Sequence, residues 1–266
     1  MQQDFLRRGV AELIGAFTLT FAGAGAILTL GLLADQAASG GGMLPPPLVG
    51  MWGLVGVALA HGLAIAVMVS ALGHISGGHF NPAVTFAFAL TRRITLPLAG
   101  VYVAMQLAGA ALAALILNWI YPGALRTASH LGAPALGGGI DSGRGFAIEA
   151  VLTFFLVLVI FATAVDPGGS FKAIAGLAIG LTITLDILMG GPLTGAAMNP
   201  SRAFGPMLVG DFWAHGWWIY FTAPLVGAGI AGLVYELLYL SPSRPEPVGP
   251  PETGVLEPRP GDAAAS

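Results

Sequence analysis

Two Asn-Pro dipeptides, Asn81-Pro82 and Asn199-Pro200, are the residues whose types and spacing could do chemistry in this sequence. Asn is a strong helix N-cap because its side-chain oxygen accepts from free backbone N–H groups, and Pro suits the next position because it lacks an N–H. When the oxygen faces its own helix, the amide NH₂ group is free to bind and orient a water oxygen. Each helix start also carries a partial positive charge, about half an elementary charge, which repels cations including hydronium. The two dipeptides therefore predict a site that orients small neutral molecules and excludes protons.

The overall composition indicates that lipid, and not water, surrounds most of this chain. Of the 266 residues, 56% are hydrophobic and 9% are charged, whereas a soluble domain carries about 25% charged residues. The net charge of −3 and the lack of a basic block give no reason to expect a nucleic-acid partner. The sequence has no cysteine, which excludes disulfides and thiolate metal sites, and we expect neither a metal nor a cofactor.

Six apolar stretches are each long enough to cross a bilayer as a helix, which takes about 20 residues. They cover residues 10–33, 49–72, 96–120, 146–165, 171–189 and 217–240. Two shorter apolar stretches begin at Asn81 and Asn199, and as helices of about ten residues they would be about 15 Å long, half the hydrocarbon core. We therefore predict an all-α membrane protein with six transmembrane helices and two re-entrant half-helices that meet N terminus to N terminus.

The two halves of the chain, about residues 9–120 and 145–240, share one pattern. Each half opens its first span with a glutamate, Glu12 or Glu149, and places its Asn-Pro helix between its second and third spans. Three is an odd number, so the second half must be inverted in the membrane, and inverted repeats place functional sites near the midplane at broken helices. A single Asn-Pro is usually only a turn or a helix start, but two copies in matched positions of such a repeat favour the functional interpretation.

The positive charges predict the orientation of the chain. With six spans, both termini share one side, which would hold seven Lys and Arg residues against Arg126 and Arg144 on the other. The positive-inside rule therefore places both termini in the cytoplasm, in a multi-pass protein of the cell membrane. We expect residues 1–8 to form a cytoplasmic N terminus, residues 9–240 the channel domain, and residues 241–266 a disordered cytoplasmic tail rich in Pro and Glu.

The strings GHISGGHFNPAVT, residues 73–85, and LTGAAMNPSRAFGP, residues 193–206, resemble the two signature loops of the aquaporins, or major intrinsic proteins. The resemblance covers residues 9–240 and implies a right-handed aquaporin bundle with one pore per protomer, assembled as a homotetramer in the lipid bilayer. It also implies two pore motifs, the second of which carries Ser where most members have Ala. The motif residues are Asn81, Pro82, Ala83, Asn199, Pro200 and Ser201.

The resemblance further implies a selectivity filter at an extracellular constriction. Counting from the motifs places this filter at His61, Ile187, Ala196 and Arg202, a set similar to that of plant vacuolar-membrane (tonoplast-type) aquaporins. Arg202 would offer donors to the solute and reject cations, and an arginine in so apolar a chain is a functional candidate. Ile187 and Ala196 would make the opening wider and less polar than a strict water filter.

The Gly-rich loops before the two motifs can expose backbone carbonyls along the path. We expect these carbonyls at Gly77, Gly78, His79, Gly195, Ala197 and Met198. The resemblance implies that Glu12 and Glu149 are structural acids that accept hydrogen bonds from these loops, with a proton relay as the alternative. His74 and His79 are interpreted as loop-packing residues, with a pH gate as the alternative, and Asp186 has no predicted role.

We therefore expect a passive water channel that excludes protons and ions, with ammonia, urea, glycerol and hydrogen peroxide as additional candidate solutes. The alternative within the family is a glycerol, urea or ammonia facilitator for which water is secondary. A secondary transporter would need coupling-ion ligands near the midplane, where the sequence offers only Asn donors and Arg202. An enzyme is not expected, because no nucleophile–base pair, paired aspartates or His-Glu-x-x-His pattern occurs.

Overall fold

The computed structural model describes residues 2–40, 46–169 and 172–240. Every regular element in this part of the chain is a helix, and six of these helices are long and apolar enough to cross a membrane. They are α1 (Gln2–Ala38), α2 (Pro46–Ser76), α4 (Leu96–Ile120), α6 (Ser142–Ile160), α7 (Ala175–Thr194) and α9 (Ile219–Leu238). The prediction of an all-α membrane protein with six spanning helices is confirmed, whereas the predicted tail at residues 241–266 lies outside the described residues.

Helix α1 extends well beyond the apolar stretch that predicted it. It begins at Gln2, and its first turns carry charged residues, of which Arg8 pairs with Asp4 at 3.0 Å across one turn. The helix continues past the hydrocarbon because its backbone hydrogen bonds are made within the helix and do not depend on lipid. The length of an apolar stretch therefore predicts the part of a helix that crosses the membrane, but it underestimates the full length of the helix.

Helix α6 starts at a cap supplied by Asp141. The Oδ1 atom of Asp141 accepts from the backbone N–H of Arg144 at 2.9 Å, and this bond lowers the pKa of the Asp141 carboxyl. The ionised carboxylate also lies at the positive end of the helix. The sequence prediction began this span at residue 146, because the residues before it are small or polar, but they form the first turn of the helix.

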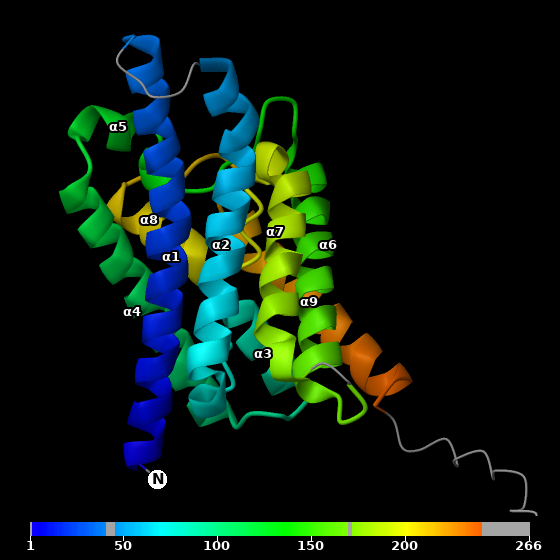
Figure 1. Ribbon diagram of the computed structural model, residues 1–266. Coiled ribbons are helices and arrows are strands. Elements are labelled where there is room, and N and C mark those ends of the chain that lie inside the picture. The colour runs from blue at the N-terminus through cyan, green and yellow to red at the C-terminus, as the bar shows by residue number, and fades with distance from the viewer. Residues whose placement is uncertain (1, 41–45, 170–171, 241–266) are drawn as a thin grey trace, which may run out of the picture.

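Two short helices, α3 (Pro82–Leu90) and α8 (Pro200–Val209), begin at the two Asn-Pro pairs. They contain 9 and 10 residues. In Figure 1, α3 lies in the lower half of the bundle, toward the end where the chain begins, and α8 lies in the upper half. Their N-terminal ends meet, because hydrogen bonds join Asn81 to the residue before Asn199, and Asn199 to the residue before Asn81.

The two halves pack through glycines at equivalent positions, separated by the same 118 residues as the two Asn-Pro pairs. Where α2 crosses α7, a Cβ on Gly62 would lie 2.4 Å from the carbonyl oxygen of Gly180, and a Cβ on Gly180 would lie 2.3 Å from that of Gly62. The same close approach recurs at Gly109 against Leu13, between α4 and α1, and at Gly227 against Ala150, between α9 and α6. Glycine at these crossings allows the backbones to approach each other closely inside the membrane.

The connection from α4 to α6 folds back into the bundle. It contains the short helix α5 (Gly123–Ala128) and the single 3₁₀ turn η1 (His130–Gly132). Leu131 and Gly132 are buried, and Gly132 has a φ of 77°, which favours glycine. This segment therefore reaches from the loop region to the interior of the protein.

Candidate functional site

Asn81 and Asn199 cap the two half-helices. The Oδ1 atom of Asn81 accepts from the backbone N–H of Ala83 at 2.8 Å. The Oδ1 atom of Asn199 accepts from the N–H groups of Ser201 and Arg202 at 3.0 and 3.3 Å. The proline after each Asn occupies the first helical turn, where no N–H is needed. The hydroxyl of Ser201 also donates to Asn199 Oδ1 at 2.8 Å, so the serine that stands in place of alanine adds a bond to the cap.

The amide NH₂ groups of these two side chains join the opposite loops. Asn81 Nδ2 donates to the carbonyl of Met198, and Asn199 Nδ2 donates to the carbonyl of Phe80, each at 2.9 Å. Because an amide has two such hydrogens, one on each Asn is left for a molecule between them. The sequence prediction left the whole NH₂ group to the passage, but the buried carbonyls need a donor where no water is present, and they take one hydrogen each.

Glu12 and Glu149 each accept several donors from the loop before one half-helix. The donors to Glu12 are the hydroxyl of Ser76, the N–H groups of His79 and Phe80, and the amide of Gln106, at 2.6–3.0 Å. The donors to Glu149 are the hydroxyl of Thr194 and the N–H groups of Ala197 and Met198, also at 2.6–3.0 Å. Both carboxylates are fully buried, and hydrogen bonds to a charged acceptor are the strong ones. They therefore hold the two loops in shape.

These bonds also decide which way the loop carbonyls point. In a trans peptide the C=O lies opposite the N–H, so an N–H that donates to the buried acid leaves the preceding carbonyl facing the other way. This arrangement turns the carbonyls of Gly78 and His79 in one loop, and those of Ala196 and Ala197 in the other, away from the acids. All four residues line the cavity described next.

A narrow cavity lies between the half-helices and the surrounding spans, with room for a water-sized sphere over about 30 Å³. One water needs about 10–15 Å³ of such space, so the cavity has room for about two water molecules. Its lining brings together both Asn side chains and all four residues of the predicted filter, His61, Ile187, Ala196 and Arg202. The rest of the wall consists of loop residues and apolar side chains; the loop residues are Gly78, His79, Ala197 and Met198, and the apolar side chains are those of Leu19, Ile65, Val84, Leu156, Ile160, Ile179 and Ile183.

Three of the residues expected to expose carbonyls are used differently. Gly77 and Gly195 follow α2 and α7 with φ angles of 94° and 84°, and neither lines the narrow cavity. Met198 does line it, but its carbonyl accepts from Asn81. The glycines are needed for the sharp turn into each loop, because other residues adopt a positive φ only with strain.

Arg202 is held by neutral partners in the wall of the cavity. Its Nε donates to Nε2 of His61 at 3.3 Å, and its Nη1 donates to the carbonyl of Gly132 at 3.0 Å. Because arginine can only donate, His61 Nε2 must be the acceptor, and the hydrogen on its Nδ1 is donated to the carbonyl of Val57 at 2.8 Å. No acidic side chain of the described residues bonds Arg202, so its charge remains to repel cations.

The opening beside Arg202 offers a solute fewer unbonded polar atoms than its four filter residues would offer if their side chains made no bonds to protein. Ile187 and Ala196 are buried and contribute no polar side-chain atoms. The two polar side chains, His61 and Arg202, are bonded to each other. Ala196 adopts a φ of 44°, a strained conformation for alanine, and its N–H is held by the hydroxyl of Thr194 at 3.1 Å. The polar atoms that a solute meets here are therefore the three N–H groups of Arg202 that bond neither His61 nor Gly132.

Several residues that shape the site were missed in the sequence. Ser76 and Thr194 donate to the buried acids, and Tyr102 and Tyr220 in turn donate to the carbonyls of Ser76 and Thr194, at 2.5 and 2.8 Å. Ser76 and Thr194 are separated by 118 residues, and so are Tyr102 and Tyr220, which is the spacing of the two Asn caps. This shared spacing is the sequence signal that could have identified all four residues. Gly132 has no such signal, because it lies in the irregular connection between the two halves.

The remaining candidates lie apart from the filter. His79 packs within its loop, with Nδ1 3.1 Å from Thr85 Oγ1 and its ring 4.3 Å from that of Phe88. His74 lines a separate pocket near the start of α1. Asp186 is buried but does not line the narrow cavity, and its Oδ2 has no hydrogen-bond partner among the described residues.

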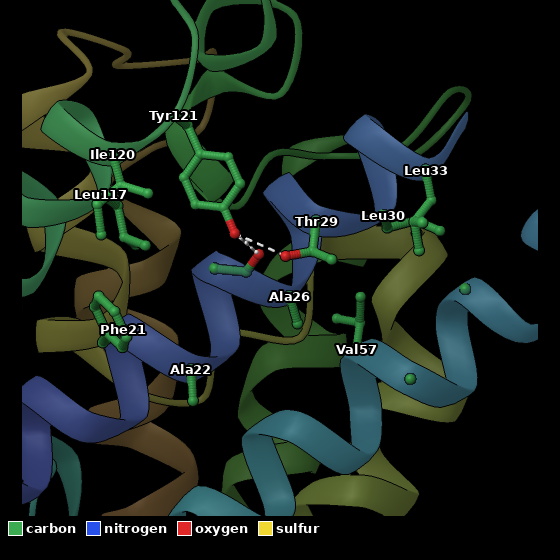
Figure 2. Close-up of a pocket in the computed structure, with 13 residues that line it drawn as sticks. Phe21, Ala22, Ala26, Thr29, Leu30, Leu33, Val57, Leu117, Ile120 and Tyr121 are labelled. Atoms are coloured by element: carbon green, nitrogen blue, oxygen red, sulfur yellow. Dashed lines mark hydrogen bonds between the residues drawn. The ribbon is translucent and has the colours of Figure 1, made fainter. Parts of the chain in front are cut away.

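A larger cavity, of about 520 Å³, lies among α1, α2 and α4. Figure 2 shows apolar side chains such as Phe21, Leu30 and Val57 around it, with Thr29 and Tyr121 bonded to each other as its polar group. It shares no lining residue with the narrow cavity and contains none of the predicted site residues. We therefore assign the passage to the narrow cavity.

Comparisons with known proteins agree with this geometry. A family model described as Major intrinsic protein matches residues 1–235. Aquaporin TIP4-4 of Zea mays is 44% identical over 245 residues, which cover 91% of this chain and 90% of the relative. Probable aquaporin TIP3-2 of Arabidopsis thaliana is also 44% identical over 245 residues, which cover 92% of this chain and 87% of the relative. The X-ray structure of the aquaglyceroporin from Plasmodium falciparum matches with a TM-score of 0.75 and 24% identity, covering 88% of this chain and 96% of that one, and supports the fold alone.

Proposed function

This chain belongs to the major intrinsic protein family, and on that premise we propose how its passage selects what crosses the membrane. The protein is a water channel, in line with the aquaporins that it resembles over most of its length. The observation that carries the proposal is the free N–H left on each of Asn81 and Asn199. Two donors that face one water oxygen occupy both of its lone pairs. That water cannot then accept from its neighbour in the file, which interrupts the path for protons.

Charge exclusion has two sources in this proposal. The N-terminal ends of α3 and α8 face each other at the centre, and each contributes a partial positive charge of about half an elementary charge. Arg202 contributes a full charge, and its hydrogen-bond partners are neutral. Cations are therefore repelled at the filter and again at the midplane, as at other half-helix barriers.

The filter is proposed to pass small neutral solutes besides water. Ile187 and Ala196 present apolar surface, and the bond between His61 and Arg202 uses donors and acceptors that a strict water filter would offer to water. Ammonia, urea, glycerol and hydrogen peroxide are the candidate solutes. The less polar opening also supports the alternative, a facilitator for ammonia, urea or glycerol in which water is secondary.

The test is a stopped-flow comparison of water, urea and glycerol permeability in proteoliposomes and in empty vesicles of the same lipid. The proposal expects water permeability well above that of the empty vesicles, with a smaller but measurable increase for urea. Glycerol or urea moving faster than water through the protein would favour the facilitator. No increase for any neutral solute would reject the filter assignment.

We also propose a homotetramer in the bilayer, with residues 9–240 as the channel domain and both termini cytoplasmic. The absence of cysteine allows a direct topology test. A single cysteine placed at Gln3 or at Ser129 can be labelled with a membrane-impermeant maleimide in intact cells that express the protein in their plasma membrane. Labelling at residue 129 and not at residue 3 is expected, and the reverse pattern would overturn the orientation.

The relatives of TIP type favour an internal membrane over the cell membrane predicted from the sequence, and fractionation distinguishes the two.

A further inference from the structure

We propose that Gly23 of α1 is a specificity-determining positioning residue, because it leaves the space in which His61 lies against α1 and accepts from Arg202. This inference rests on the proposed function, since it concerns the filter of the same passage. Gly23 does not line the passage, so it would act through His61.

The distances at Gly23 leave no room for a side chain. A Cβ at this position would lie 2.3 Å from Nε2, 2.4 Å from Cδ2 and 2.7 Å from Cε1 of His61. Ordinary contacts of a Cβ begin near 3.4 Å, so the ring would have to move by about 1 Å. The closest atom, Nε2, is the one that accepts from Nε of Arg202. The missing side chain at residue 23 thus sets the place of an acceptor for the filter arginine.

The next residue of α1 supports the other acceptor. A Cβ on Gly132 would lie 2.8 Å from the Cβ and 2.9 Å from the Cα of Ala24. The carbonyl of Gly132 accepts from Nη1 of Arg202. Two consecutive residues of α1 therefore lie against both hydrogen-bond partners of the Arg202 side chain, although α1 supplies none of the four filter residues.

The direction of the displacement follows from what surrounds the ring. On one side of His61 lies the α1 backbone at Gly23, and on another its Nδ1 is tied to the carbonyl of Val57 on α2, which faces α1 in Figure 2. The narrow cavity is the open space that the ring lines. A methyl group at residue 23 would push the ring toward this space, and Nε2, the ring atom nearest to the methyl group, would change its place relative to Arg202. Because the cavity has room for only about two water molecules, a displaced ring should affect solutes larger than water most.

Gly23→Ala in the full-length protein, reconstituted in liposomes, tests this proposal. We expect urea permeability to fall relative to water permeability by about fivefold, the ratio that one net hydrogen bond is worth. Gly56→Ala is the matched control, because it adds the same methyl group to α2, five residues before His61, where no atom lies within 4 Å. Gly56→Ala should leave both permeabilities unchanged.

The double variant Gly23→Ala/His61→Ala distinguishes positioning from general damage. If Gly23 acts through the ring, the double variant should match His61→Ala alone in both permeabilities. An equal effect of Gly23→Ala with and without the ring would overturn the proposal. If Gly23→Ala fails to fold, the proposal requires that the double variant folds, and failure of both would also overturn it.

A spectroscopic readout separates this inference from the proposed function. The ¹⁵N signal of His61 Nε2, assigned by its loss in His61→Ala, should shift in Gly23→Ala and not in Gly56→Ala. A shift in a protein that conducts no water would reject the channel assignment and leave the positioning role in place. Normal conduction without any shift would reject the positioning role alone.

Discussion

At the scale of single residues, the passage depends on how many polar atoms remain free for a solute. Each Asn cap keeps one amide hydrogen for the passage, because its other polar atoms are bonded to protein. At the filter, His61 and Arg202 satisfy each other in part. Free N–H donors therefore remain both at the midplane, on Asn81 and Asn199, and at the filter, on Arg202, whereas Ile187 and Ala196 add only apolar surface there.

Changing Ile187 to histidine tests this account of the filter. A second imidazole in the cavity wall narrows the opening and adds a polar atom, so urea and glycerol flux should fall by about tenfold or more while water flux is largely kept, since a site that matches water penalises larger solutes. Stopped-flow light scattering with each solute measures both. An equal loss of water and urea flux would contradict the assignment of Ile187 to the filter.

At the scale of elements, the glycine crossings and the buried acids give the half-helices their places. The sequence predicted the six spans and both half-helices, because apolar length and Asn-Pro caps are local signals. It could not predict the bonds from Asn81 to Met198 or from Arg202 to Gly132, which join residues 117 and 70 positions apart. Such contacts depend on how the helices pack. Only contacts that occur in both halves, such as those of Tyr102 and Tyr220, produce a repeated spacing that can be recognised in the sequence.

Gly180→Ala tests the crossing of α2 and α7. The added Cβ would lie 2.3 Å from the backbone carbonyl of Gly62, which cannot move aside without separating the two helices. We expect a loss of about 1–3 kcal/mol in the free energy of unfolding, as for other overpacked sites. Thermal unfolding in detergent measures it. Gly100→Ala on α4 is the control, because no atom lies within 4 Å of its added Cβ. Equal melting temperatures for the two variants would contradict the packing argument.

Glu149→Gln tests the role of the buried acids. Glutamine has the same shape, but its amide hydrogens would face the N–H groups of Ala197 or Met198, which now donate to the carboxylate. Leaving a buried donor unsatisfied should cost about 1–3 kcal/mol of stability, and it should also reduce water flux. In contrast, Glu236→Gln removes a half-exposed pair with Arg93 and should cost at most about 1 kcal/mol. A Glu149→Gln protein as stable and as active as wild type would reject the structural role.

At the scale of the whole molecule, the spans enclose a passage whose polar atoms come from both halves of the chain. Neither half alone brings together Asn81, Asn199 and Arg202. The inverted repeat explains why the same contacts occur in both halves. The filter does not follow the repeat, because His61 in the first half and Arg202 in the second have no polar equivalents 118 residues away.

The absence of cysteine from the chain predicts its response to mercury. Mercuric chloride should leave water permeability unchanged, because no thiol is present to bind the metal. Ala196→Cys provides the positive control, because residue 196 lines the narrow cavity and a mercurated side chain would close it. Strong inhibition of the wild-type protein that a thiol reverses would contradict the prediction.

Water and proton permeability measured in the same proteoliposomes tests the central claim most directly. Stopped-flow light scattering reports the water flux after an osmotic step, and an entrapped pH-sensitive dye reports the proton flux under a pH gradient. Two Asn donors and facing helix ends predict rapid shrinkage with no proton flux above that of empty vesicles. Vesicles that shrink no faster than empty ones, or a proton flux that rises together with water flux, would contradict it.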